Sequence, residues 1–180
     1  LAVYYGMLRA RHGMVKELRP ISGLDAIDEA IGRATEMGRP INYSTGLAAI
    51  DGEKAAETFA SMDILNHVAS RCARMDCNLV VTNKDPVIHS IAEAVVVQAY
   101  GIAGAGDKLK PDTVRFLSSE QFAFSAQAMG IMHRERIAAN MLIGRFGSEA
   151  LHLAETGTQL GAIQIAGTEN IYQLPFFVTA

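Results

Sequence analysis

The sequence predicts an α/β domain of the three-layer, Rossmann-like type, with a mainly parallel sheet of about five to six strands. Short β-branched runs alternate with amphipathic helical runs almost throughout the chain. Several helical runs begin at good capping residues, and the connections between elements are short. Because strands that alternate with helices pair in parallel through crossover connections, helices should cover both faces of the sheet.

The first half of the chain supplies the clearest elements. We predict them over residues 23–37 (helix), 40–44 (strand), 53–75 (helix), 79–82 (strand) and 86–100 (helix). Gly38 and Pro40 end the first helix, while Asp85 and Pro86 suit the cap and first turn of the third. By helical periodicity, the 53–75 helix is expected to bury Ala56, Phe59, Ala60, Met62, Leu65, Ala69 and Cys72.

The second half repeats the alternation. We predict strands over 113–117, 138–143, 162–166 and 176–178, a helix from Ser118 to Met132, and a helix that ends at Glu155. Ser118 and Gln121 match a capping box, and Thr156-Gly157 is the expected stop of the last helix. The run 133–136 reads as a charged connection into the amino end of a strand, which favours a structural or interface role.

Composition limits the classes of function. A chain of 180 residues, 49% hydrophobic and 19% charged, suits one domain with a real core. The net charge of −3 and the absence of a basic stripe argue against a nucleic-acid partner. Cys72 and Cys77 lack the spacing or partners of a zinc site, so we expect two reduced, mostly buried thiols, which fits a cytosolic face.

The N-terminal residues 1–22 have the pattern of a membrane-proximal segment. An apolar run with two tyrosines, residues 1–8, precedes the basic residues Arg9, Arg11, His12, Lys16 and Arg19. The alternative is an ordinary buried strand or helix with solvated charges. No segment reaches the roughly 20 apolar residues of a transmembrane helix. We therefore expect the single domain, 23–180, to face the cytoplasm beside membrane segments outside this chain, and to continue beyond Ala180.

Five small polar loops follow the predicted strands, and parallel pairing would place them at one edge of the sheet. In the run 144–148, two glycines allow close backbone approach, Arg145 offers a bidentate donor and Ser148 caps a helix. The run matches neither a Walker sequence nor GxGxxG. The alternative is that these residues only cap helices and form turns. The candidate ligand-binding residues are Thr82, Asn83, Lys84, Ser118, Gly144, Arg145, Gly147, Ser148, Gly167 and Thr168.

No motif identifies a reaction. There is no GxSxG, neither cysteine has an activating histidine nearby in sequence, and the catalytic residues and cofactor are unknown. Glu149, His152 and Glu155 have the spacing of a carboxylate-bridged metal helix, but no second copy of the motif exists, so a solvated helix face is the better interpretation. We predict no metal site, and nothing in the sequence requires an enzyme.

The stretches Gly23–Pro40, Leu153–Gly157 and Gly161–Thr168 resemble a family of bacterial and archaeal proteins that is catalogued only as a domain of unknown function. The resemblance extends over nearly the whole chain. In that family the domain usually lies beside transmembrane helices, so the resemblance implies a membrane-attached protein. It implies no reaction, ligand or catalytic residue.

Three functions fit these observations. We favour assembly: a homo-oligomer, or a ligand-responsive binding domain presented by a membrane protein. The alternative is an enzyme or binding module for a nucleotide, a sugar phosphate or another small anion, held at the carboxyl ends of the strands by Lys84 and Arg145. The third is a structural spacer without a pocket on that face.

Overall fold

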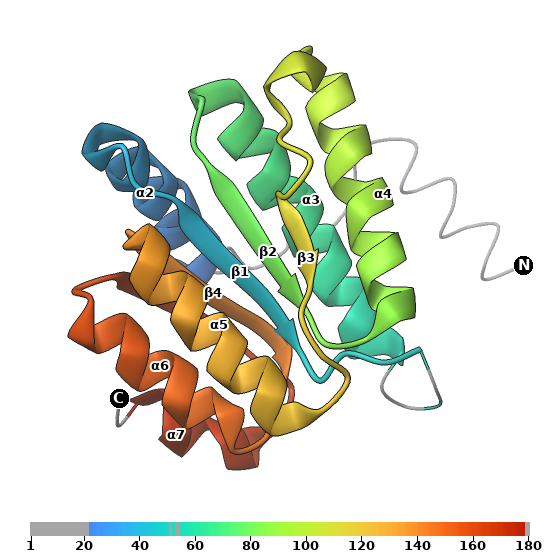
Figure 1. Ribbon diagram of the computed structural model, residues 1–180, viewed down its shortest axis with the longest axis vertical. Helices are drawn as coiled ribbons and strands as arrows, with labels where there is room; N and C mark the ends of the chain where they lie inside the picture. Colours follow the sequence, from blue (N-terminus) through green and yellow to red (C-terminus); the bar gives the residue numbers. More distant parts are fainter. Residues whose placement is uncertain (1–21, 51, 53–54, 179–180) are drawn as a thin grey trace, which may run out of the picture.

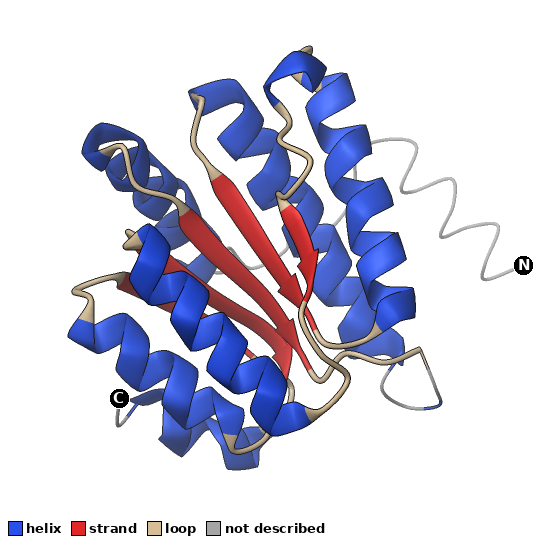
Figure 2. Cartoon of the chain, viewed as in Figure 1, coloured by secondary structure: helices blue, strands red, loops and turns tan. Residues whose placement is uncertain are grey.

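The computed structural model describes residues 22–50, 52 and 55–178. One sheet of five parallel strands has the order β3-β2-β1-β4-β5, with helices on both faces (Figures 1 and 2). The prediction of a three-layer, Rossmann-like α/β domain is therefore confirmed. The chain runs from β1 outward to β3 and then crosses to the other side of β1 for β4 and β5. Doubly wound folds reverse direction in this way at a switch point between the two central strands.

The predicted alternation of helices and strands is confirmed from residue 22 to residue 167. The elements are α2 (Ser22–Met37), β1 (Ile41–Gly46), α3 (Ala55–Met75), β2 (Leu79–Asn83), α4 (Pro86–Ile102), η2 (Gly106–Lys108), β3 (Val114–Phe116), α5 (Gln121–Glu135), β4 (Ala139–Arg145), α6 (Glu149–Gln159), β5 (Ile163–Gly167), η3 (Ile171–Gln173) and α7 (Leu174–Val178). Asp85 caps α4 as predicted, because its carboxylate accepts hydrogen bonds from the next helical amides.

Two predicted boundaries are wrong at helix ends. The predicted strand 176–178 belongs to the short helix α7, because a short apolar run alone does not distinguish strand from helix. Thr156-Gly157 does not stop α6, which continues to Gln159. Gly157 is instead a packing position: a Cβ there would lie 2.6 Å from the Gln164 side-chain oxygen.

The boundaries of α5 also differ from the prediction. Glu120, rather than Ser118, is its N-cap, and the Glu120 carboxylate accepts a 2.9 Å hydrogen bond from the Ala123 amide. The Ser118 hydroxyl, two residues before the cap, accepts a 3.1 Å hydrogen bond from the Glu120 amide. The charged run 133–136 is the last turn of α5 rather than a connection, and Arg136 ends the helix at a φ of 52°.

Two apolar cores lie on opposite faces of the sheet. Helices α2, α3 and α4 cover one face, and α5 and α6 cover the other, with α7 beside α6 (Figure 1). On the first face the Tyr43 hydroxyl donates a 2.6 Å hydrogen bond to the Ser61 carbonyl, and burial raises the pKa of Tyr43 far above its usual value. No helix in the described ranges has the length and apolar character to cross a membrane. The predicted membrane-proximal segment lies, apart from Ser22, outside those ranges.

Candidate functional site

The ten candidate ligand-binding residues gather at the carboxyl ends of the strands. Because all five strands are parallel, the loops after β2, β3, β4 and β5 share one edge of the sheet. Thr82 and Asn83 are buried at the end of β2, whereas Lys84 is half-buried in the loop. The other candidates are Ser118, Gly144, Arg145, Gly147, Ser148, Gly167 and Thr168. The predicted common edge therefore exists, and ligand binding there remains a prediction.

The two central strands, β1 and β4, close against each other at this edge. The Leu47 amide donates a 2.7 Å hydrogen bond to the Arg145 carbonyl. Gly46 has a φ of 59°, and a Cβ at this position would lie only 2.3 Å from the same carbonyl oxygen. Doubly wound folds often hold a ligand in a crevice at this switch point. In this protein the two backbones meet there directly.

A buried carboxylate occupies the loop between β4 and α6. Glu149 is 1% exposed and accepts a 2.8 Å hydrogen bond from the Gly147 amide and another from the Gln121 side chain. Ser148 is the N-cap residue of α6, as predicted, but its hydroxyl makes no capping hydrogen bond. The predicted solvated face includes His152 and Glu155, which are exposed, but not Glu149. The Gly147 amide is therefore hydrogen-bonded to Glu149 and is not available to a bound anion.

A second buried carboxylate joins α3 to the end of β5. One oxygen of Glu57 accepts 3.2 Å hydrogen bonds from the Thr168 hydroxyl and the Glu169 amide. Thr168 also hydrogen-bonds Gln173, whose side chain accepts from the Phe146 amide at 3.0 Å. Sequence reasoning missed Glu57 and Gln173. The acidic residue in the first helical turn was the available signal for Glu57, and Gln173 had none.

Unpaired polar groups remain near the end of β2. The Thr45 hydroxyl donates a 3.0 Å hydrogen bond to the Asn83 side-chain oxygen. The Thr82 hydroxyl and the Asn83 amide nitrogen are buried without a partner among the described residues. Lys84 and Arg145 make no side-chain hydrogen bond or ion pair with those residues either. Cations and neutral donors of these types are the groups that recognise small anions in proteins, and anion binding by this set remains a prediction. No group of three potential metal ligands occurs within the described ranges.

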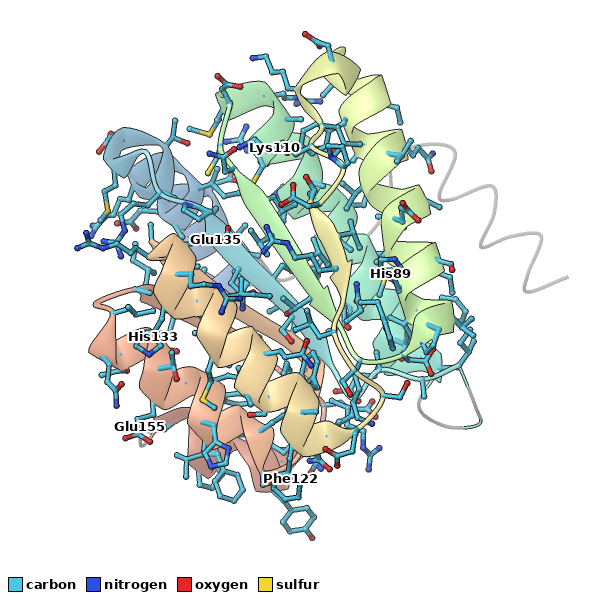
Figure 3. The ribbon with its side chains drawn as sticks, viewed as in Figure 1. His89, Lys110, Phe122, His133, Glu135 and Glu155 are labelled. Carbon is cyan, nitrogen blue, oxygen red and sulfur yellow. The ribbon has the colours of Figure 1, made fainter. Side chains whose placement is uncertain are left out.

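The opposite end of the sheet contains a cavity of about 360 Å³ that sequence reasoning did not predict. Residues from α3, α4, α5 and the starts of β2 and β3 line it, including Cys72, Cys77, Tyr100, Lys110, Arg115 and Glu135. Figure 3 shows Lys110 where the strands begin and Phe122 at the far end. Arg115 pairs with Asp112 and Glu135, and the Lys110 ammonium donates a 2.7 Å hydrogen bond to Asn78. The cavity is therefore polar and contains charges of both signs.

Comparison with known proteins identifies the family. The family model for the domain of unknown function DUF6754 matches residues 1–180, and the chain belongs to this family. No curated protein and no solved structure matches the chain. The family match agrees with the resemblance seen in the sequence, whereas membrane attachment, localisation and partners remain predictions.

Proposed function

We propose that this domain is a self-assembly module of a membrane-attached protein, facing the cytoplasm, in which a second copy packs against the outer face of α4. One observation carries the proposal. Among the nine exposed residues of α4, Glu93 alone is charged. The other two helices of this layer, α3 beside α4 and α2 beyond α3, together expose several charged residues. An outer helix of a monomeric domain would ordinarily be charged on its solvent face.

The outer face of α4 has the shape of a helix-packing surface. Val87 and Val97 are 54% and 52% exposed, and they stand among the small residues Ser90, Ala94 and Gly101. Small residues let a second backbone approach closely, while the valines supply apolar area. A shallow groove follows part of this face, lined by Pro86, Val87, Ser90, Ile91, Ala94, Val95 and Gln98.

A second copy of the chain is the occupant that suits this face best. In a two-fold contact the same surface meets itself, so a helix face with a single charge, Glu93, meets an equally apolar face with matching small residues. A charged partner would leave its charges desolvated and unpaired against α4. Attachment of both copies to one membrane would raise their effective concentration, so a contact of modest area would suffice.

The oligomeric state tests this proposal. Sedimentation equilibrium of the 180-residue chain should show a concentration-dependent dimer, and Val97→Glu should weaken dimerisation by about tenfold or more, because it desolvates a charge. Phe122→Glu is the matched control, since Phe122 is 70% exposed on α5. A monomer at all concentrations, or equal effects of the two substitutions, would contradict the proposal.

Membrane attachment is tested separately on the full-length protein in its own cells. The proposal expects the protein in the membrane fraction, with this domain digested by protease added from the cytoplasmic side only. It rests on the apolar and basic pattern of residues 1–22. Recovery of the full-length protein in the soluble fraction would refute it.

A second candidate function is binding of a small anion at the carboxyl ends of β2 and β4, either by a binding module or by an enzyme for a nucleotide or sugar phosphate. The Thr82 hydroxyl, the Asn83 side-chain nitrogen and the cations Lys84 and Arg145 favour it, since none of them has a side-chain partner among residues 22–50, 52 and 55–178. Inorganic phosphate titrated into the labelled chain should shift the backbone amide resonances of these loops. Arg145→Ala should abolish the shifts, and unchanged affinity in this variant would exclude the site.

A further inference from the structure

The two cysteines are brought together by the end of α3. Cys72 lies in the last turns of the helix, and Cys77 follows after Asp76, which adopts a left-handed φ of 59°. This turn folds the chain back, and the Cys77 amide donates a 2.9 Å hydrogen bond to the Cys72 carbonyl. Both side chains reach the same cavity from this turn, and the Cys77 thiol also donates a weak 3.9 Å hydrogen bond to the Asn78 carbonyl. A backbone motif, not chance packing, holds them adjacent.

Both thiols line the amino-end cavity. Cys72 and Cys77 are almost fully buried, but both form part of the wall of this 360 Å³ cavity. Lys108 and Lys110 belong to the same wall, at its exposed side. Lys108 forms an ion pair with Asp76 at 3.1 Å, whereas Lys110 donates a hydrogen bond to the neutral side-chain amide of Asn78. The cavity therefore has a cation available near its entrance and a pair of thiols within.

The two neighbouring thiols are chemically unequal. The interaction with Cys72 lowers the pKa of Cys77, although burial opposes the shift. The interaction with Cys77, together with burial, raises the pKa of Cys72. A thiolate is the reactive form of cysteine, so Cys77 is suited to attack and Cys72 to follow as the resolving thiol.

We propose that Cys72 and Cys77 form a redox-active dithiol site that reacts with small, carboxylate-bearing disulfides entering the amino-end cavity. The Cys77 thiolate attacks one sulfur of the disulfide, whose S–S bond breaks, and the first half leaves as a thiolate. The Cys72 sulfur then attacks Cys77 in the mixed disulfide, and the second half leaves with the proton of Cys72. The protein gains an internal disulfide and loses two electrons, which reduce the substrate to two thiols.

Glutathione disulfide is the probe that tests the reaction. The folded 180-residue chain is incubated with it, quenched with acid and weighed by mass spectrometry. The wild type should form the Cys72–Cys77 disulfide without retained glutathione, and Cys72→Ser should accumulate one glutathione on Cys77. Cys77→Ser should react at least about tenfold more slowly, because the remaining thiol of Cys72 is 0% exposed and burial by itself raises its pKa. Circular dichroism establishes that each variant is folded.

Two results would overturn the proposal. One is a folded wild type that stays reduced while the urea-unfolded chain reacts. The other is equal glutathione capture by the two cysteine variants.

The role of the cavity is tested with Lys110→Ala. This change should slow the reaction with glutathione disulfide by about two- to fivefold at low salt, because one attractive charge is lost. The reaction with the uncharged 2-hydroxyethyl disulfide should not change. Arg33→Ala, which removes an exposed cation of α2 outside the cavity wall, is the matched control. A uniform effect on both disulfides, or the same loss in Arg33→Ala, would refute entry past Lys110.

Discussion

Polar side chains at the two ends of the sheet differ in their burial and in the partners they bond. At the carboxyl end, the carboxylates of Glu57 and Glu149 are buried and accept hydrogen bonds from neighbouring loops. At the amino end, charged side chains such as Lys108 and Asp76 pair at the exposed rim of a cavity. The difference shows that a parallel sheet does not by itself leave its carboxyl end open. Here internal carboxylates occupy part of that end, and the cavity beside the two cysteines lies at the other.

The contrast has an energetic consequence. A buried carboxylate that accepts backbone hydrogen bonds is costly to remove, because its donors lose their partners. An exposed ion pair contributes little, because water screens it and both long side chains lose freedom. Substitutions at the carboxyl end should therefore destabilise the fold, whereas those at the amino end should mainly alter chemistry in the cavity.

The largest effect is expected at the contact between β1 and β4. Gly46→Ala should lower the free energy of unfolding by about 3–5 kcal/mol, from left-handed strain and collision with the Arg145 carbonyl. Gly38→Ala is the control: its φ is 62°, but nothing lies within 4 Å of its Cβ position, so about 1–2 kcal/mol is expected. Urea unfolding measures both. Equal losses would show that the carboxyl end is not closed by this contact.

The next effect concerns the buried carboxylate of α6. Glu149→Ala should destabilise the fold by about 2–4 kcal/mol, because the Gly147 amide and the Gln121 side chain lose their acceptor. Glu155→Ala, on the exposed side of the same helix, should change stability by less than about 0.5 kcal/mol. A loss of stability in Glu149→Ala no larger than that in Glu155→Ala would contradict this prediction, because it would mean that water replaces the lost acceptor in this loop.

The buried phenol of Tyr100 is the exception at the amino end. Burial is the main cause that raises the pKa of Tyr100 in the folded state far above its ordinary value. The nearby thiols and Asp76 raise it further. Above about pH 10 the unfolded chain ionises first and binds fewer protons, so stability falls by about 1.4 kcal/mol per pH unit for each such phenol. Tyr43 contributes the same loss. Tyr100→Phe should therefore flatten, but not abolish, the alkaline decline in urea-unfolding free energy.

The exposed Tyr172→Phe serves as the control for this alkaline measurement. An unchanged slope in Tyr100→Phe would mean that the Tyr100 phenol is already solvated from the cavity.

The smallest effect is expected at the rim of the cavity. Lys108→Met removes an ion pair whose side chains are 47% and 72% exposed, so stability should change by less than about 0.5 kcal/mol. Thermal unfolding at low and high salt provides the measurement. A loss above 1 kcal/mol, or a strong salt dependence in the wild type alone, would place the rim charges among the stabilising contacts.

Helix α3 shows where sequence reasoning failed. Its second half buries Leu65, Ala69 and Cys72 as predicted, but Ala56, Phe59 and Ala60 are exposed. Their neighbours Glu57, Thr58 and Ser61 are buried instead. Thr58 hydrogen-bonds Ala49 in the preceding loop, while Glu57 and Ser61 hydrogen-bond segments far away in the chain. Periodicity assigns polar residues to solvent, so it cannot identify a polar face that other segments satisfy.

The sequence by itself determined the α/β class, the order of the elements and the common edge of the candidate loops. These follow from local physics: the periodicity of apolar residues, helix capping and short connections that require parallel pairing. Only the tertiary structure decided the strand order, the burial of Glu57 and Glu149, and the cavity beside Cys72 and Cys77. Each of these depends on contacts between residues far apart in the chain or on how loops pack in space, and local sequence preferences do not specify either.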